Sequence, residues 1–114
     1  MIRIIKELVA AKADTAVDLA KKIWSYAELA YEETQSAAAL MEALEQEGFT
    51  IEKGIAGIPT AFTAVFKSGS GKPVVGFLAE YDALAGLSQK AAWPVRQAIK
   101  EGGAGHGCGH NLLG

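Results

Sequence analysis

One uninterrupted apolar run, Pro73 to Ala79, constrains the fold of this chain more than any other feature. The run is too short for a typical helix, and it lacks the polar alternation of a strand that has one face in water. Continuous apolar sequence of this length is typical of a strand covered on both faces in the middle of an α/β sheet. We therefore predict an α/β fold in which helices pack on a mixed, mainly parallel sheet whose core strand is Pro73–Ala79.

Two helices are predicted before this strand. Apolar residues recur with helical period from Ile2 to Ala27, which favours one long amphipathic helix. A second helix is expected from Thr34 to Glu47, with the Thr34 hydroxyl as its amino-terminal cap. Gly48 then ends the helix, and Phe49 is placed to fold back as the hydrophobic contact of a Schellman cap.

After Gly48 the sequence is typical of strands and turns. Short strands are predicted at Thr50–Ile55 and Thr60–Lys67, and the segment Ser68–Gly71 is predicted to be a turn. Farther along, Gln89–Glu101 favours a helix that begins near Pro94. From Gly102 onward alternate glycines exclude an ordinary helix or strand.

Composition limits both the size and the partners of the chain. Its 114 residues, half of them hydrophobic, suffice for a single domain. A formal charge of −2 with interspersed acids and bases offers no basic face for nucleic acid or for an anionic membrane. No apolar run approaches the roughly 18 residues of a membrane-spanning helix, so we expect a soluble protein. Cys108 is the only cysteine, which excludes an intrachain disulfide and suits a reducing cytoplasm.

Both histidines and the sole cysteine lie close together, at His106, Cys108 and His110. Thiolate and imidazole are preferred ligands of zinc and similar divalent metals. A spacing of two residues puts Cys108 and His110 on one side of an extended backbone, and the intervening glycines allow tight loops. His106 is a third ligand or a supporting group. The competing interpretation is a mobile glycine-rich tail, whereas a phosphate-binding loop is excluded because its glycine and lysine pattern is absent.

A second group of polar residues, Glu80-Tyr81-Asp82, follows the predicted core strand directly. Ligands of open α/β sheets bind at the carboxyl ends of the strands, so both carboxylates are well placed to bind or orient a metal. By themselves, acidic residues at a strand end are more commonly solvated. We assign Glu28, Glu32 and Glu33 to a solvated face and to the first-turn charges of the second helix.

Three segments of the sequence together resemble one known family. These segments are Gly105–Gly114 (Gly-His-Gly-Cys-Gly-His-Asn-Leu-Leu-Gly), Glu80–Leu84 (Glu-Tyr-Asp-Ala-Leu) and Ala27–Thr34 (Ala-Glu-Leu-Ala-Tyr-Glu-Glu-Thr). They are similar to the His-x-Cys-Gly-His, Asp-x-Asp-Ala-Leu and Pro-Glu-Leu-x-x-x-Glu segments of metal-dependent amidohydrolases and peptidases related to aminoacylase and carboxypeptidase. The resemblance covers essentially the whole chain.

The resemblance implies a role for each site residue. Cys108 and His110 match metal ligands, and Asp82 matches the catalytic acid that orients a ligand beside the metals. His106 and Glu80 are expected to contact the ligands rather than the metal, and Glu80 does not take the role of the histidine that the wider family has at its position. Two divalent ions, zinc or manganese, are implied for each intact site.

The resemblance also implies that residues 1–114 are the amino-terminal portion of a larger catalytic metal-binding domain. The lid domain, the glutamate general base and the remaining ligands of the family lie beyond such a portion. The intact enzyme would hydrolyse the amide bond of a small N-acyl amino acid, aminobenzoyl-glutamate or a dipeptide, and would form a homodimer. The 114-residue chain alone would be inactive. The alternative is a non-catalytic α/β module that binds a metal or a partner through its glycine-rich end.

Overall fold

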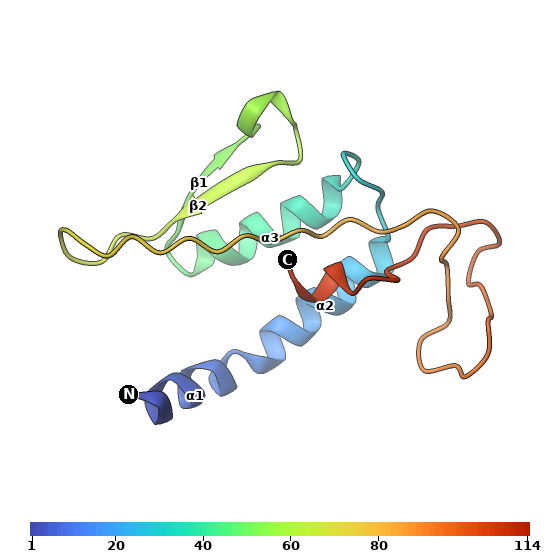
Figure 1. Cartoon of the computed structure of the whole chain (residues 1–114), viewed down its shortest axis with the longest axis horizontal. Coiled ribbons are helices and arrows are strands. Elements are labelled where there is room, and N and C mark those ends of the chain that lie inside the picture. Colours follow the sequence, from blue (N-terminus) through green and yellow to red (C-terminus); the bar gives the residue numbers. More distant parts are fainter.

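The computed structural model describes all residues, 1–114, as three helices, one β-hairpin and long irregular segments. The elements are α1 (Ile2–Ala11), α2 (Ala13–Tyr26), α3 (Thr34–Gln46), β1 (Thr50–Lys53), the 3₁₀ turn η1 (Ile55–Gly57), β2 (Phe62–Val65) and the 3₁₀ turn η2 (His110–Leu112). Helix α3 contacts α2 on one side and the hairpin on the other (Figure 1). The carboxy-terminal turn η2 returns to lie against α2.

The predicted first helix forms with one interruption. Lys12 separates α1 from α2, with φ −101° and ψ −1°. Helix α1 has no buried residue, whereas α2 buries Ile23. The second helix begins at Thr34 as predicted, but Glu33 occupies the cap position and no side-chain cap bond comes from Thr34.

The predicted carboxy-terminal cap of α3 is confirmed. Gly48 has φ 88°, and its amide donates to the carbonyl of Glu45 at 3.0 Å. The Phe49 amide donates to the Leu44 carbonyl at 3.0 Å, which completes the Schellman pattern. The Phe49 ring also lies 5.4 Å from that of Phe66, centroid to centroid, so the cap is tied to the end of the hairpin.

The sheet contains two antiparallel strands. Strands β1 and β2 pair from Thr50 opposite Val65 to Lys53 opposite Phe62. Both lie inside the ranges predicted for strands. The prediction of a mainly parallel sheet was wrong, because the one parallel contact is an isolated bridge between Leu29 and Ala83.

The prediction that Pro73–Ala79 forms a buried core strand was also wrong for this chain. The segment follows a cis Lys72–Pro73 peptide bond and belongs to no sheet. Its side chains are exposed, with Val74 and Phe77 at 91% and Leu78 at 104% of full exposure. A strand needs neighbouring backbone groups to pair with, and no element of the chain pairs with this one to supply them.

The helix predicted over Gln89–Glu101 does not form. Pro94 lacks an amide donor, and the Gln89 side chain bonds the surrounding backbone instead. Its amide nitrogen donates to the Val95 carbonyl at 3.0 Å, and its oxygen accepts from the Gln97 amide at 2.9 Å. Side-chain bonds of this kind compete with the helical backbone pattern.

The molecule is flat and open, with extents of 52 × 38 × 20 Å. Its accessible surface of 8759 Å² exceeds the roughly 5,900 Å² expected of a compact protein of this mass. The small apolar core consists of Ile23, Ala37, Leu40 and Ala83, where α2, α3 and the segment after residue 80 meet. No helix has both the length and the apolar character required to cross a membrane.

Candidate metal centre

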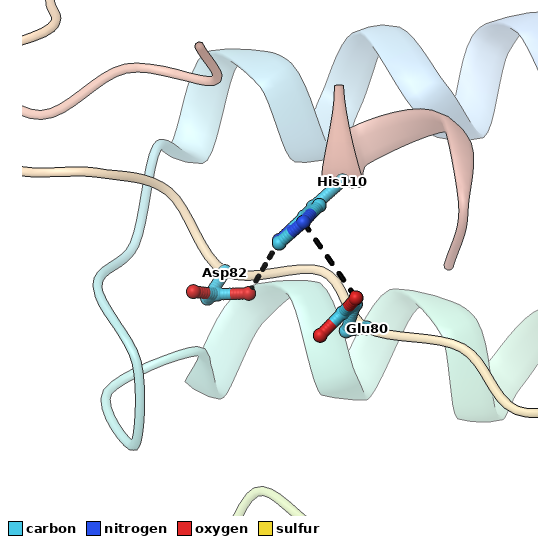
Figure 2. Close-up of side chains that lie close together, drawn as sticks. All are labelled: Glu80, Asp82 and His110. Atoms are coloured by element: carbon cyan, nitrogen blue, oxygen red, sulfur yellow. Dashed lines mark hydrogen bonds and ion pairs between the residues drawn. The ribbon is translucent and has the colours of Figure 1, made fainter. Parts of the chain in front are cut away.

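Three side chains from two distant segments converge at Glu80, Asp82 and His110 (Figure 2). His110 Nδ1 lies 2.7 Å from Asp82 Oδ1, and His110 Nε2 lies 3.7 Å from Glu80 Oε1. All three donor atoms lie within 4.8 Å of one another. The His110 and Asp82 side chains are 19% and 23% exposed and that of Glu80 is 66% exposed, so the cluster opens to solvent on the Glu80 side.

The extended backbone of residues 80–82 explains why both carboxylates face the histidine. Alternate side chains of an extended segment point to opposite sides. Glu80 and Asp82 therefore lie on the His110 side, and Tyr81 points the other way, where its hydroxyl donates to the Thr60 carbonyl. Tyr81 thus anchors the segment that carries the two acids.

Backbone bonds join this segment to the rest of the site. The Ala83 amide donates to the Glu28 carbonyl at 2.7 Å, just after α2. Leu84 and Gly105 exchange two backbone hydrogen bonds, of 2.9 and 3.0 Å. These bonds hold the start of the glycine-rich loop beside Asp82, although the two bonded residues are far apart in the sequence.

The glycines of the loop have specific steric roles. A Cβ on Gly105 would lie 2.1 Å from the Leu87 carbonyl oxygen, so no side chain fits there. Gly109 has φ 81°, a left-handed conformation that favours glycine, and it immediately precedes η2 and His110. The loop is also tied to α2, because the Asn111 side chain donates to the Ala20 carbonyl at 3.3 Å.

The acids around His110 stabilise its charged form. Its hydrogen bond with Asp82 is the largest influence, burial acts in the opposite direction, and the negative charge of Glu80 adds to the effect of Asp82. The net result is a raised pKa of His110. An imidazole in this setting holds a proton, or a cation in its place, more readily than an isolated one does.

Glu28, which the sequence analysis assigned to a solvated face, instead supports the segment that carries Asp82. Glu28 accepts hydrogen bonds from the backbone amides of Gln35 and Ser36, at 2.9 and 2.8 Å, and from the Ser36 hydroxyl at 2.8 Å. Burial opposes its ionisation, but these bonds outweigh burial and lower the pKa of Glu28. Glu28 therefore supplies the missing cap of α3, while its own carbonyl holds Ala83.

The assignment of Glu33 to a solvated face was also wrong. Of Glu28, Glu32 and Glu33, only Glu32 is exposed. Glu33 is 8% exposed and accepts a 2.8 Å hydrogen bond from the Thr60 hydroxyl. Burial, and then the charges of Glu33 and Glu28, raise the pKa of Tyr81 to about 12. No periodic pattern marked these acids, and the available signal was their place in the Ala27–Thr34 segment that resembles the family.

The remaining predicted site residues lie outside the cluster. Cys108 is exposed, and its sulfur is not among the converging atoms. His106 Nε2 lies 3.0 Å from the Ile23 carbonyl oxygen, and its buried Nδ1 has no hydrogen-bond partner. His106 also borders an open pocket of about 990 Å³ between α2 and the 87–106 loop, which Trp24 and Trp93 help to line.

The donor set suits a divalent metal. Two carboxylates and an imidazole are ligands that zinc and manganese accept. Two ligand atoms at about 2.1 Å from one tetrahedral ion are separated by roughly 3.4 Å, which is close to the 3.7 Å between His110 Nε2 and Glu80 Oε1. Metal-bound histidines commonly donate their second ring N–H to a carboxylate, as His110 Nδ1 does toward Asp82.

Comparison with known proteins places these residues in a segment shared with hydrolases, although no family model matches the sequence. Over 98% of its length the chain is 47% identical to one of the subunits of p-aminobenzoyl-glutamate hydrolase from Escherichia coli K12, and it covers 23% of that subunit. It is 33% identical to the Xaa-Arg dipeptidase of Mus musculus over 98% of the chain and 25% of the relative. It is 29% identical to thermostable carboxypeptidase 1 of Saccharolobus solfataricus over 86% of the chain and 24% of the relative.

The chain therefore spans about a quarter of the length of the curated relatives it matches. The similarity covers 98% of the chain and therefore includes both segments that form the cluster. The resemblance inferred from the sequence motifs is confirmed, because nearly the whole chain is similar in sequence to a hydrolase subunit, a dipeptidase and a carboxypeptidase.

Proposed function

We propose that this chain supplies part of the metal site of a hydrolase that cleaves the amide bond of a small N-acyl amino acid, with aminobenzoyl-glutamate as the first substrate to test. The convergence of Glu80, Asp82 and His110 within 4.8 Å carries the proposal. These three residues lie in the region that is 47% identical to the p-aminobenzoyl-glutamate hydrolase subunit of Escherichia coli. A dipeptide is the next substrate class, since two other relatives are a dipeptidase and a carboxypeptidase by name.

In this proposal each residue of the cluster has one role. His110 binds the metal through Nε2, and Asp82 positions the ring by accepting the Nδ1 proton. The 3.7 Å separation supports Glu80 as a ligand, in place of the supporting role expected from sequence. A bound divalent ion would polarise the substrate carbonyl and lower the pKa of a water molecule. The negative charges of Glu80 and Asp82 would also help to hold a cation against His110.

Cys108 stays a proposed ligand that the present geometry does not bring to the cluster. It is two residues from His110 on the same glycine-rich loop, and a rotation of that loop would be needed to turn its sulfur inward. The proposal also includes zinc or manganese as the metal, two ions in each intact site, and a homodimer as the assembled enzyme. A cytoplasmic location fits the single, unpaired cysteine.

Residues 1–114 are proposed to form the amino-terminal portion of the catalytic domain, with a general base and further ligands supplied by polypeptide beyond them. The accessible surface of 8759 Å² supports the proposal that residues 1–114 are one portion of a larger domain, because much of their apolar surface is left for other polypeptide to cover. The small-molecule amide would bind where that further polypeptide faces the cluster.

A segment exchange tests the proposed activity. The chain would replace the 47% identical region of the Escherichia coli hydrolase subunit, and hydrolysis of aminobenzoyl-glutamate would be measured in the otherwise complete enzyme. We expect activity to be retained, and His110→Ala in the exchanged segment to reduce kcat/KM by at least about a hundredfold. Glu52→Gln, which changes an exposed acid on β1, serves as the matched control and should leave the rate unchanged.

The same exchange separates this proposal from the non-catalytic alternative. An exchanged enzyme that folds and binds metal but hydrolyses no amide would reject the hydrolase assignment and favour a metal-binding module. Equal activity of the parent and His110→Ala exchanges would reject the proposed site.

A further inference from the structure

We propose that Glu33 and Thr60 are positioning residues of the candidate metal centre and act on it through Tyr81. We call these three residues the Tyr81 tether. The tether keeps both carboxylates of the cluster turned toward the histidine. This inference rests on the proposed metal site, and it places part of the control over that site in the start of α3 and in the connection of the hairpin.

Burial distinguishes the tether from the other polar residues of the chain. Three polar side chains are buried, and two of them belong to Glu33 and Thr60, each 8% exposed. The third, Ser36, binds Glu28. Burying a carboxylate or a hydroxyl costs free energy unless a hydrogen-bond partner is present. The Thr60 hydroxyl donates to the Glu33 carboxylate at 2.8 Å, so each of the two residues provides the partner of the other.

The backbone holds both of these residues in place. Glu33 lies at the cap position of α3, and its carbonyl accepts from the Ala37 amide at 2.9 Å. Thr60 lies in the connection between β1 and β2. The next residue, Ala61, closes that connection, because its carbonyl accepts from the Gly54 amide at 2.8 Å. The tether therefore begins in two parts of the fold that are fixed without any help from the metal cluster.

The segment that carries the two acids lacks support of this kind. No backbone hydrogen bond involves residues 67–82, and the first one after this stretch starts at the Ala83 amide. Glu80 therefore lies at the end of a long unpaired stretch of backbone. The Tyr81 hydroxyl donates to the Thr60 carbonyl, and this bond is the one that ties the segment to the hairpin.

The extended backbone lets this one bond orient two carboxylates. The neighbours of Tyr81 point away from it, and Figure 2 shows Glu80 and Asp82 both turned toward His110. A twist of the backbone at Tyr81 would turn both acids at once. Ligands must be held to within about 0.5 Å for a metal site to work, so the 3.7 Å between Glu80 Oε1 and His110 Nε2 depends on the tether.

Cobalt titration of the folded 114-residue chain tests the role of Tyr81. Tyr81→Phe removes the hydroxyl but keeps the ring, whose centroid lies 6.2 Å from that of Phe62. We expect cobalt binding at least about tenfold weaker than in the parent chain, with a visible spectrum shifted toward that of Glu80→Gln. Tyr31→Phe removes the hydroxyl of a side chain that is 72% exposed, and this matched control should bind cobalt as the parent does.

Substitutions of Thr60 test the next step of the tether. Thr60→Val keeps the shape of the side chain but cannot donate to Glu33, and it should weaken cobalt binding about fivefold. Thr60→Ser keeps the hydroxyl and should retain most of the affinity. Thr63→Val makes the same change at an exposed position of β2 and should have no effect. Equal losses in Thr60→Val and Thr60→Ser would overturn the role of the hydroxyl.

A double variant tests whether Thr60 acts through Tyr81. Cobalt binding by Thr60→Val with Tyr81→Phe should be no weaker than binding by Tyr81→Phe alone, because the first change then has no hydroxyl left to act through. Additive losses would overturn the tether. Each titration is run well below the melting temperature of the variant, so a role in stability alone would leave the cobalt affinity and spectrum unchanged.

The same titrations separate failure of the tether from failure of the metal site. Cobalt binding that is equally strong in the parent chain and in Tyr81→Phe would reject the tether and leave the proposed metal site intact. A parent chain that binds no cobalt would reject the metal site, and the tether with it.

Discussion

At the scale of single residues, Glu28 has the widest structural influence in the molecule. Its carboxylate caps the first turn of α3 through Gln35 and Ser36, and its carbonyl accepts from Ala83 next to the metal cluster. One residue thus links a helix start to the segment that carries Asp82. Sequence alone did not identify this role. A capping side chain is normally sought at the residue where the helix begins, and Glu28 lies well before the first turn of α3.

Glu28→Gln should lower the free energy of unfolding by about 1 kcal/mol near neutral pH, since the amide keeps an acceptor but loses the charge. The folded-state pKa of Glu28 lies below the ordinary value of 4.5, so its ionisation stabilises the fold above that pH. The advantage disappears as the pH falls through 4.5 toward the lowered pKa. Urea unfolding of both proteins across this range measures the difference, and a difference that grows on acidification would contradict the assignment.

At the scale of elements, the sequence predicted local structure well and long-range pairing poorly. The start of α3 at Thr34 and its end at Gly48 follow from side-chain period and glycine chemistry within a few residues. The pairing of β1 with β2 is also local. The run Pro73–Ala79 shows the limit of such reasoning, because its composition indicates a strand but cannot say whether this chain supplies the neighbouring strands.

The same limit applies to the site. Motifs indicated Asp82 and His110, and the structure brings them together through the Leu84–Gly105 bridge. Glu80 was given a lesser role because family motifs have a histidine there, whereas geometry places its carboxylate within reach of His110. Cys108 matched the family motif as His110 did, but it lies apart from the cluster.

Two leucines, one buried and one exposed, test the location of the core. Leu40 in α3 is 5% exposed and Leu78 is fully exposed. Leu40→Ala should lower the free energy of unfolding by about 2–4 kcal/mol, whereas Leu78→Ala should change it by less than about 0.5 kcal/mol in dilute, monomeric solution. Urea unfolding of each variant measures both values. A larger loss for Leu78→Ala would restore the buried core strand that the sequence suggested.

At the scale of the whole molecule, openness is the dominant property. The radius of gyration is 16.1 Å, against about 13 Å for a compact chain of this length. The cluster lies at the surface of this thin structure, with Glu80 largely in water. We expect a site so exposed to bind a metal weakly and not to exclude water from a reacting amide.

We therefore expect no amide hydrolysis by the isolated 114-residue chain, even with added zinc, manganese or cobalt. The chain offers two converging ligands, Glu80 and His110, while Asp82 positions the histidine, and no separate general base lies beside them. Release of aminobenzoate from aminobenzoyl-glutamate, followed over long incubation with a metal-only control, is the measurement. Turnover that is abolished by His110→Ala would contradict the expectation.

Cobalt titration of the metal-free chain tests whether Glu80, Asp82 and His110 form a metal centre, because the absorption spectrum of bound cobalt reports its ligands. We predict weak cobalt binding that His110→Ala abolishes and that Glu80→Gln weakens, while chelation leaves the melting temperature of the chain unchanged. A thiolate-to-cobalt charge-transfer band that Cys108→Ser removes would place the sulfur in the site. Cobalt binding that is unaffected by His110→Ala and Glu80→Gln would contradict the assignment of Glu80, Asp82 and His110 as the metal centre.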